Sequence, residues 1–217
     1  FQKSDNRTQE LLLNTAYLSQ MTAAMAEELT GHSDAGAILA HLYQNNYFVS
    51  LKQAKPEPVY QYHPLLREFL LSRAAETLGK ERRIGLQRVS AALLEAIGQV
   101  SEAVALLRDT SDWERMVQVI DRHGATMLDQ GRSETLAQWV EAMPKDAVQQ
   151  HPWALYWLAA SRLSVAPRES RLLYEQTFER FNAQPEPGVK GLLIAASGAM
   201  DAILYELDDF SLLDRWI

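Results

Sequence analysis

The first 78 residues show hydrophobic patterns that change from helical to strand-like spacing and back. Gly31 is a natural stop for one predicted helix, and Ser33 is a natural cap for the next. The stretch Gln53–Pro58 reads as a turn between two strands. In chain order the pattern predicts helices over residues 8–17, 21–29 and 34–44 and strands over 47–51 and 59–62, followed by a fourth helix. Three helices and a two-stranded ribbon predict a winged helix over residues 1–78.

The segment Val59–Leu70, V-Y-Q-Y-H-P-L-L-R-E-F-L, is the most informative part of this pattern. Tyr60 and Tyr62 alternate along the predicted strand, and His63 stands at the turn where the strand gives way to a helix. Leucines at 65, 66 and 70 with Phe69 mark one face of that helix. The same segment therefore predicts both a strand end and a helix start, with a histidine between them.

From Gly79 onward the apolar spacing is helical throughout, with glycines, prolines and Asp109-Thr110 as stops. The predicted helices cover residues 81–97, 101–107, 112–123, 125–129, 133–142, 152–163, 167–181 and 189–207. Short helices that repeat in pairs predict an α-helical superhelix over residues 79–217. The tetratricopeptide consensus fits loosely, because Trp153 and Tyr156 suit it but Glu169 stands where a small residue is usual. The fold class is mainly α.

Composition narrows the functions that this chain can have. Residues 1–78 carry 6 Lys and Arg against 8 Asp and Glu, and residues 79–217 carry 15 against 20, which gives net charges of −2 and −5. Neither half has the positive excess that contact with nucleic acid requires, and the helix predicted over 34–44 has no Lys or Arg. A stand-alone DNA-binding winged helix is therefore disfavoured.

The sequence also lacks the residues that several kinds of catalytic and metal site require. The absence of cysteine excludes disulfides, thiolate catalysis and Cys-ligated zinc, and the five histidines show no metal-binding spacing. The apolar run around 192–200 is too short to span a bilayer. We expect a cytoplasmic protein with no membrane contact, no metal and no catalytic residues of its own.

Five phrases, in order, resemble the middle of MalT-like regulators of the LuxR type, which are STAND-type signal-transducing ATPases. The phrases are L-L-L-N-T-A-Y-L at 11–18, L-T-G-H-S-D-A at 29–35, Y-Q-Y-H-P-L-L-R-E-F-L at 60–70, D-W-E-R-M-V at 112–117 and L-A-Q-W-V-E-A-M-P at 136–144. The resemblance implies a winged-helix arm followed by a helical-repeat sensor domain, excised from a longer protein. It also implies an upstream nucleotide-binding domain that holds ATP or ADP, and a downstream DNA-binding domain. This chain has no phosphate-binding loop, because Gly79-Lys80 is followed by Glu81.

His63 is the candidate cofactor-contacting residue. In the proteins that the chain resembles, the corresponding histidine reaches the β-phosphate of ADP and holds the inactive state. A neutral imidazole can donate one hydrogen bond to phosphate. Pro64 replaces the aspartate of the related eukaryotic motif and suits the first turn of a helix. The alternative is a histidine that caps the local backbone.

The aromatic residues Trp153, Tyr156, Trp157 and Tyr174 are the candidate ligand-binding residues of the second half. Stacking on a sugar ring or a peptide side chain would suit them. The alternative is that they form the core between helices, as such stripes do in α-solenoids.

Two functions remain open from the sequence. The first is a regulatory fragment that couples nucleotide state to the binding of a small-molecule inducer or a regulatory protein. Its winged helix would pack on the next helices around residues 86–97. The second is a helical-repeat scaffold for protein–protein interaction with no nucleotide switch.

Overall fold

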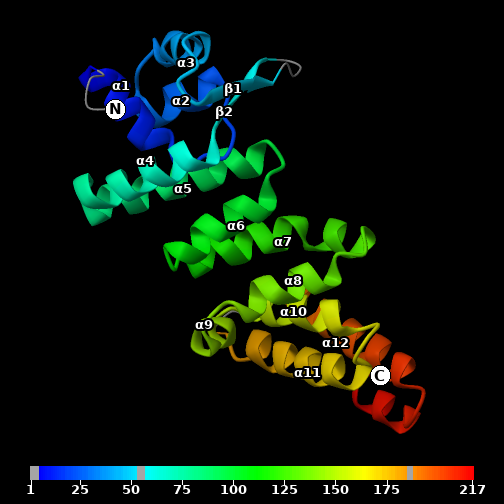
Figure 1. The fold of residues 1–217 in the computed structure, drawn as a ribbon. Coiled ribbons are helices and arrows are strands. Elements are labelled where there is room, and N and C mark those ends of the chain that lie inside the picture. Colours follow the sequence, from blue (N-terminus) through cyan, green and yellow to red (C-terminus); the bar gives the residue numbers. More distant parts are fainter. Residues whose placement is uncertain (1–4, 53–56, 185–187) are drawn as a thin grey trace. The chain divides into compact units, whose positions relative to one another are not determined.

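The computed structural model describes residues 5–52, 57–184 and 188–217. The chain is mainly helical, with one two-stranded antiparallel sheet, as the sequence predicts. It divides into two compact units, residues 1–110 and residues 111–217 (Figure 1). The helices that follow residue 79 are therefore shared between the units. The domain boundary expected at residues 78 and 79 stays a prediction.

The first unit has the element order of a winged helix followed by two more helices. Its elements are α1 (Asn6–Thr15), α2 (Ala23–Thr30), α3 (Ala35–Gln44), β1 (Val49–Lys52), β2 (Val59–Tyr62), α4 (Pro64–Thr77), α5 (Lys80–Ala96) and α6 (Val100–Asp109). Gly31 ends α2 with φ 71°, as expected. The cap expected at Ser33 is wrong: α3 is preceded by Asp34, whose carboxylate pairs with Arg7 at 3.1 Å.

The hairpin is anchored to the segment between α1 and α2. β1 and β2 pair in antiparallel register, with Val49 opposite Tyr62. Met21 and Tyr60 exchange backbone hydrogen bonds of 2.9 and 2.8 Å, so this segment adds a one-residue bridge to the free side of β2. Leu11, Leu18 and Leu70 are fully buried in the core of this unit. Part of the expected turn, residues 53–56, lies outside the described residues.

The second unit consists of helices joined by short connections. They are α7 (Trp113–Asp129), α8 (Ser133–Glu141), α9 (Lys145–Gln150), α10 (Pro152–Arg162), α11 (Pro167–Asn182), α12 (Val189–Glu206) and the 3-10 helix η1 (Phe210–Arg215). Two sequence predictions fail here. Gly124 does not end a helix but lies inside α7, and α9 was not predicted. None of the helices in the described parts of the chain is long and apolar enough to cross a membrane.

Helices of the second unit approach closely where an aromatic ring lies over a glycine. A Cβ added to Gly198 of α12 would lie 2.4 Å from Cε1 of Tyr174 on α11. A Cβ on Gly191 would lie 2.7 Å from Phe181, and one on Gly124 would lie 2.6 Å from Trp157. Any larger side chain at these positions would push the helices apart, which explains why glycine stands inside α7 and α12.

We predict that Gly198→Ala destabilises the second unit although alanine favours helix formation. Replacing a mid-helix glycine by alanine ordinarily adds about 1 kcal/mol of stability. Overpacking against Tyr174 should outweigh this gain, because an inserted methyl group in a filled core costs roughly 1–3 kcal/mol. Gly85→Ala in α5 is the matched control, since its added Cβ meets nothing within 4 Å. Urea unfolding should show Gly198→Ala less stable and Gly85→Ala more stable than the parent. Equal gains in both variants would contradict the packing role.

Candidate functional site

The junction between β2 and α4 is held against α1 by a buried hydroxyl pair. The hydroxyl oxygens of Tyr62 and Thr15 lie 2.6 Å apart. Thr15 donates its own hydrogen to the Leu11 carbonyl at 2.7 Å, so the Tyr62 hydroxyl is the donor to Thr15. Burial raises the pKa of Tyr62 well above its usual range, which keeps the phenol protonated. Tyr62 therefore fixes the last residue of β2 relative to α1.

His63 follows Tyr62 and forms the N-cap of α4. Its Nδ1 accepts a hydrogen bond from the Leu65 backbone N–H at 3.3 Å, and Pro64 occupies the first turn. An Nδ1 atom that accepts cannot carry the proton of a neutral ring, so that proton resides on Nε2. The structure therefore contains the local backbone cap that was the alternative role for His63. The role of His63 at a nucleotide phosphate stays a prediction.

Phe48 lies beside His63 and was not recognised from the sequence. The centroids of the two rings are 6.0 Å apart with an interplanar angle of 66°. The Phe48 carbonyl also accepts the His63 backbone N–H at 2.8 Å. Phe48 has φ 57°, a left-handed backbone that is unusual for a bulky residue, and its side chain is 65% exposed. Leu65, two residues after His63, is also exposed, at 69%.

Arg67 connects α4 to the C-terminal end of α1. Its Nε donates to the Ala16 carbonyl at 3.0 Å, and its Nη2 donates to the Tyr17 carbonyl at 3.1 Å. Carbonyl groups at the end of a helix lack partners within the helix, and a cation is the favoured one. Burial lowers the pKa of Arg67 from its ordinary value. The arginine of the phrase Y-Q-Y-H-P-L-L-R thus has a positioning role.

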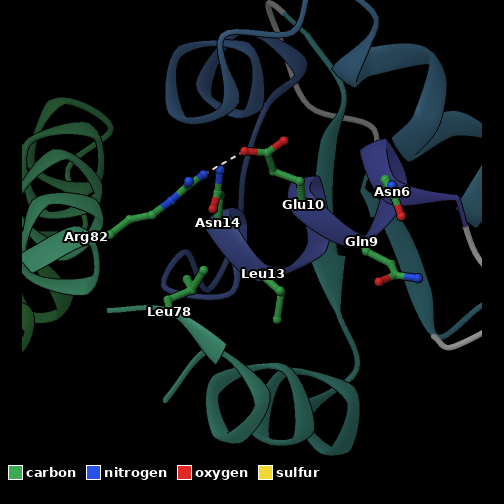
Figure 2. A pocket seen from close by; sticks show the side chains of 7 residues that line it. All are labelled: Asn6, Gln9, Glu10, Leu13, Asn14, Leu78 and Arg82. Carbon is green, nitrogen blue, oxygen red and sulfur yellow. Dashed lines mark hydrogen bonds and ion pairs between the residues drawn. The ribbon is translucent and has the colours of Figure 1, made fainter. Parts of the chain in front are cut away.

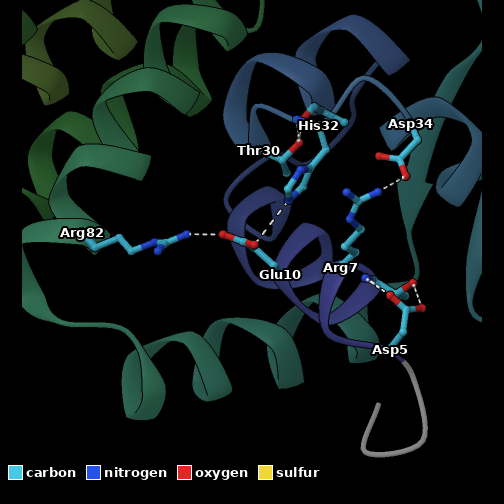
Figure 3. Close-up of polar contacts among 9 residues, drawn as sticks. Asp5, Arg7, Glu10, Thr30, His32, Asp34 and Arg82 are labelled. Carbon is cyan, nitrogen blue, oxygen red and sulfur yellow. Dashed lines mark hydrogen bonds and ion pairs between the residues drawn. The ribbon is translucent and has the colours of Figure 1, made fainter.

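A second polar cluster joins α1 to α5 and to the connection between α2 and α3 (Figure 3). Glu10 accepts a hydrogen bond from Arg82 Nη2 at 2.6 Å, and its other oxygen lies 3.3 Å from His32 Nε2. These two partners, Arg82 first, hold the pKa of Glu10 below its usual value. His32 belongs to the phrase L-T-G-H-S-D-A, and its ring lies beside the Glu10 carboxylate.

A small pocket adjoins this cluster, with a volume of about 260 Å³ (Figure 2). Within the described parts of the chain, the buried Oδ1 of Asn14 has no hydrogen-bond partner. The residues that line the pocket are Asn6, Gln9, Glu10, Leu13, Asn14, Leu78 and Arg82. None of these residues is recognisable as a site residue from the sequence, because polar positions on a helix face are ordinarily solvated.

The four candidate ligand-binding aromatics do come together in the second unit. Tyr156 lies 5.7 Å from Tyr174 and 4.9 Å from Trp157 between ring centroids, and Trp153 lies 5.8 Å from Tyr156. Trp157 is buried and donates from Nε1 to Asp121 at 3.0 Å. Burial raises the pKa of Tyr156 and that of Tyr174.

These contacts are the ones that the core alternative predicts. Trp157 and Tyr174 lie over Gly124 and Gly198, so their faces are already occupied by protein. Trp153 is packed edge-on against Phe181 at 5.2 Å and has the Lys190 ammonium 5.5 Å from its ring. A ligand-binding role for the four aromatics stays a prediction.

Comparison with known proteins concerns the first part of the chain. Residues 1–82 match the family model of the MalT winged helix domain. No protein of curated function matches the chain. The match ends within α5 and includes the β2–α4 junction, Phe48 and the Glu10–Arg82 pair. It supports a MalT-like relationship for this part of the molecule.

We predict that Tyr62→Phe lowers the free energy of unfolding by about 1 kcal/mol at neutral pH, the usual net value of one hydrogen bond. The difference should vanish in alkali. In the folded chain the pKa of Tyr62 is raised above the 10.0 of an exposed tyrosine, so its stabilising contribution is complete below pH 10 and declines as the pH rises further. Urea unfolding at pH 8 and pH 11 measures this. Tyr43→Phe, at an exposed position, is the control and should show no such change. A pH-independent difference for Tyr62→Phe would contradict the assignment.

We also predict that Glu10→Gln lowers the free energy of unfolding of the first unit at neutral pH but not in acid. The folded-state pKa of Glu10 is lowered from 4.5, so its contribution is present above pH 4.5 and disappears as the pH falls through the lowered value. Glu10 is partly exposed, so the loss at pH 7 should be below about 1 kcal/mol. Unfolding at pH 7 and pH 3 tests this, with exposed Glu28→Gln as control. If the two variants behave alike, the Arg82 and His32 contacts contribute nothing.

Proposed function

We propose that this chain is a regulatory part of a MalT-like transcription regulator. In this proposal the winged helix reports the nucleotide state of a neighbouring nucleotide-binding domain, and the helical second unit binds an inducer or a regulatory protein. The observation that carries the proposal is the accessible His63 at the start of α4, inside the region that matches the MalT winged helix domain.

The chemistry of the β2–α4 junction suits a phosphate group. His63 is exposed, and its Nε2 carries the proton of the neutral ring as a donor, because Nδ1 is occupied by the Leu65 N–H. The N-terminus of α4, a helix of 14 residues, adds the positive end of its dipole. Its first turn is Pro64-Leu65-Leu66, so no carboxylate repels an anion there.

The same junction is suited to transmit a contact. Tyr62 and Arg67 fasten it to α1, and Glu10 of α1 binds Arg82 of α5. α5 also contacts α2 and α4. The packing expected around residues 86–97 stays a prediction. A shift of His63 on loss of a phosphate would therefore move α1 and α5 together with α4.

The second unit would take the effector. Binding can favour the active arrangement only if the effector has different affinities for the two arrangements. Trp153 and Tyr156 are half-buried, so such a ligand would reach their exposed ring edges first. The chain itself would hold no cofactor. ATP or ADP would be held by the neighbouring domain, and operator DNA would be bound elsewhere in the protein.

The test is ADP release from the protein that joins this chain to its nucleotide-binding domain. His63→Ala should speed release roughly five- to tenfold, the effect of one lost hydrogen bond. His63→Gln, which keeps a donor, should restore part of the retention. His41→Ala, at an exposed histidine of α3, is the control. A release rate that His63→Ala leaves unchanged would refute the nucleotide-sensing role and favour the interaction scaffold.

A further inference from the structure

Phe48 occupies the position directly across the hairpin from His63. The register of β1 and β2 pairs Val49 with Tyr62, so the residue before β1 lies opposite the residue after β2. The His63 backbone N–H donates to the Phe48 carbonyl at 2.8 Å, which continues the ladder by one pair. Opposite residues of an antiparallel pair have side chains close enough to interact. Backbone pairing therefore brings the Phe48 ring to the imidazole.

The backbone conformation of Phe48 is unfavourable for a phenylalanine. Its φ of 57° lies in the left-handed region, which is strained for a residue with a Cβ and uncommon for a bulky one. Asn46 has nearly the same φ, 55°, but asparagine tolerates this conformation. Burial does not account for a phenylalanine at position 48, because the residue is 65% exposed. The contact of its ring with His63 offers a reason of another kind.

The imidazole of His63 needs a second contact to be held in one orientation. The hydrogen bond from the Leu65 N–H to Nδ1 is 3.3 Å long, and N–H donors usually lie about 2.9–3.0 Å from their acceptors. An exposed side chain held by one long hydrogen bond changes rotamer within nanoseconds. The Phe48 ring supplies the further contact, with centroids 6.0 Å apart and an interplanar angle of 66°. This edge-to-face geometry is one that aromatic pairs prefer.

From these observations we infer that Phe48 is a positioning residue for His63. Its ring holds the imidazole in the rotamer whose Nδ1 accepts the Leu65 N–H, so that the proton of the neutral ring stays on Nε2. A donor held in this way loses less conformational entropy when it binds a phosphate. This last consequence rests on the proposed nucleotide function, whereas the ordering of His63 by Phe48 is a property of this chain alone.

Two glycine substitutions separate the role of the ring from the effect of the strained backbone. Phe48→Gly removes the ring and also relieves the strain, because glycine adopts a positive φ without a steric cost. Asn46→Gly is the matched control, since it replaces a second left-handed residue and leaves both rings in place. Both variants should keep the fold, which circular dichroism checks.

Carbon-13 relaxation of the imidazole Cε1–H group, recorded on the 217-residue chain, measures the order of the His63 ring. In Phe48→Gly the order parameter of this group should fall below about 0.6, the range of flexible groups. It should remain high in the parent and in Asn46→Gly. Phe48→Tyr, which retains an aromatic ring, should keep the parent's value. The same order parameter in the parent and in Phe48→Gly, or an equal fall in Asn46→Gly, would overturn the inference.

A double-mutant cycle tests whether Phe48 acts on the nucleotide through His63. In the protein that joins this chain to its nucleotide-binding domain, Phe48→Gly should speed ADP release roughly two- to fivefold, less than His63→Ala because the donor remains. Added to His63→Ala, it should change nothing further, because a positioning residue has no effect once its target is gone. Additive effects would refute the positioning role. If His63→Ala leaves ADP release unchanged, the proposed function fails, while the order parameter of His63 still decides the inference.

Discussion

The hydrogen bond from the Tyr62 hydroxyl to Thr15 fixes the end of β2 on α1, and the winged helix is organised around it. Because Tyr62 is the last strand residue and His63 the N-cap of α4, the same contact sets where α4 begins. Arg67 repeats the attachment one turn later by closing the carbonyl end of α1. His63 thus emerges from a junction that is held on both sides, so that its ring is positioned by the fold and not by a mobile loop.

The second unit depends on a different constraint, the close approach of helices at glycine. Tyr174, Phe181 and Trp157 each lie over a glycine of a neighbouring helix. This arrangement buries large apolar rings while the helix backbones remain near one another, and dispersion contacts gain from the short distance. Arg171 adds a largely buried ion pair with Glu206 between α11 and α12. Rigid packing of this kind lets a helical unit pass on a displacement at one helix to the next.

The sequence predicted the winged helix well because its signals are local: alternation in two strands, Gly31 after α2 and the Tyr-His-Pro turn. It failed where tertiary contacts decide. Gly124 looked like a stop, but it is the position that admits Trp157, and only the neighbouring helix reveals this. Phe48 looked like a strand residue, whereas its left-handed backbone places it beside His63. The Glu10–Arg82 pair joins residues 72 apart in sequence, and no spacing rule could have found it.

The protonation of His63 at Nε2 depends on one hydrogen bond, from the Leu65 N–H to Nδ1. Long-range ¹H–¹⁵N NMR correlations of the imidazole, recorded on this chain at a pH where His63 is neutral, identify the protonated ring nitrogen directly. The account predicts a pure Nε2–H tautomer for His63. A ring protonated on Nδ1, or an even mixture of tautomers, would show that the cap does not form and that the donor is not directed to a phosphate.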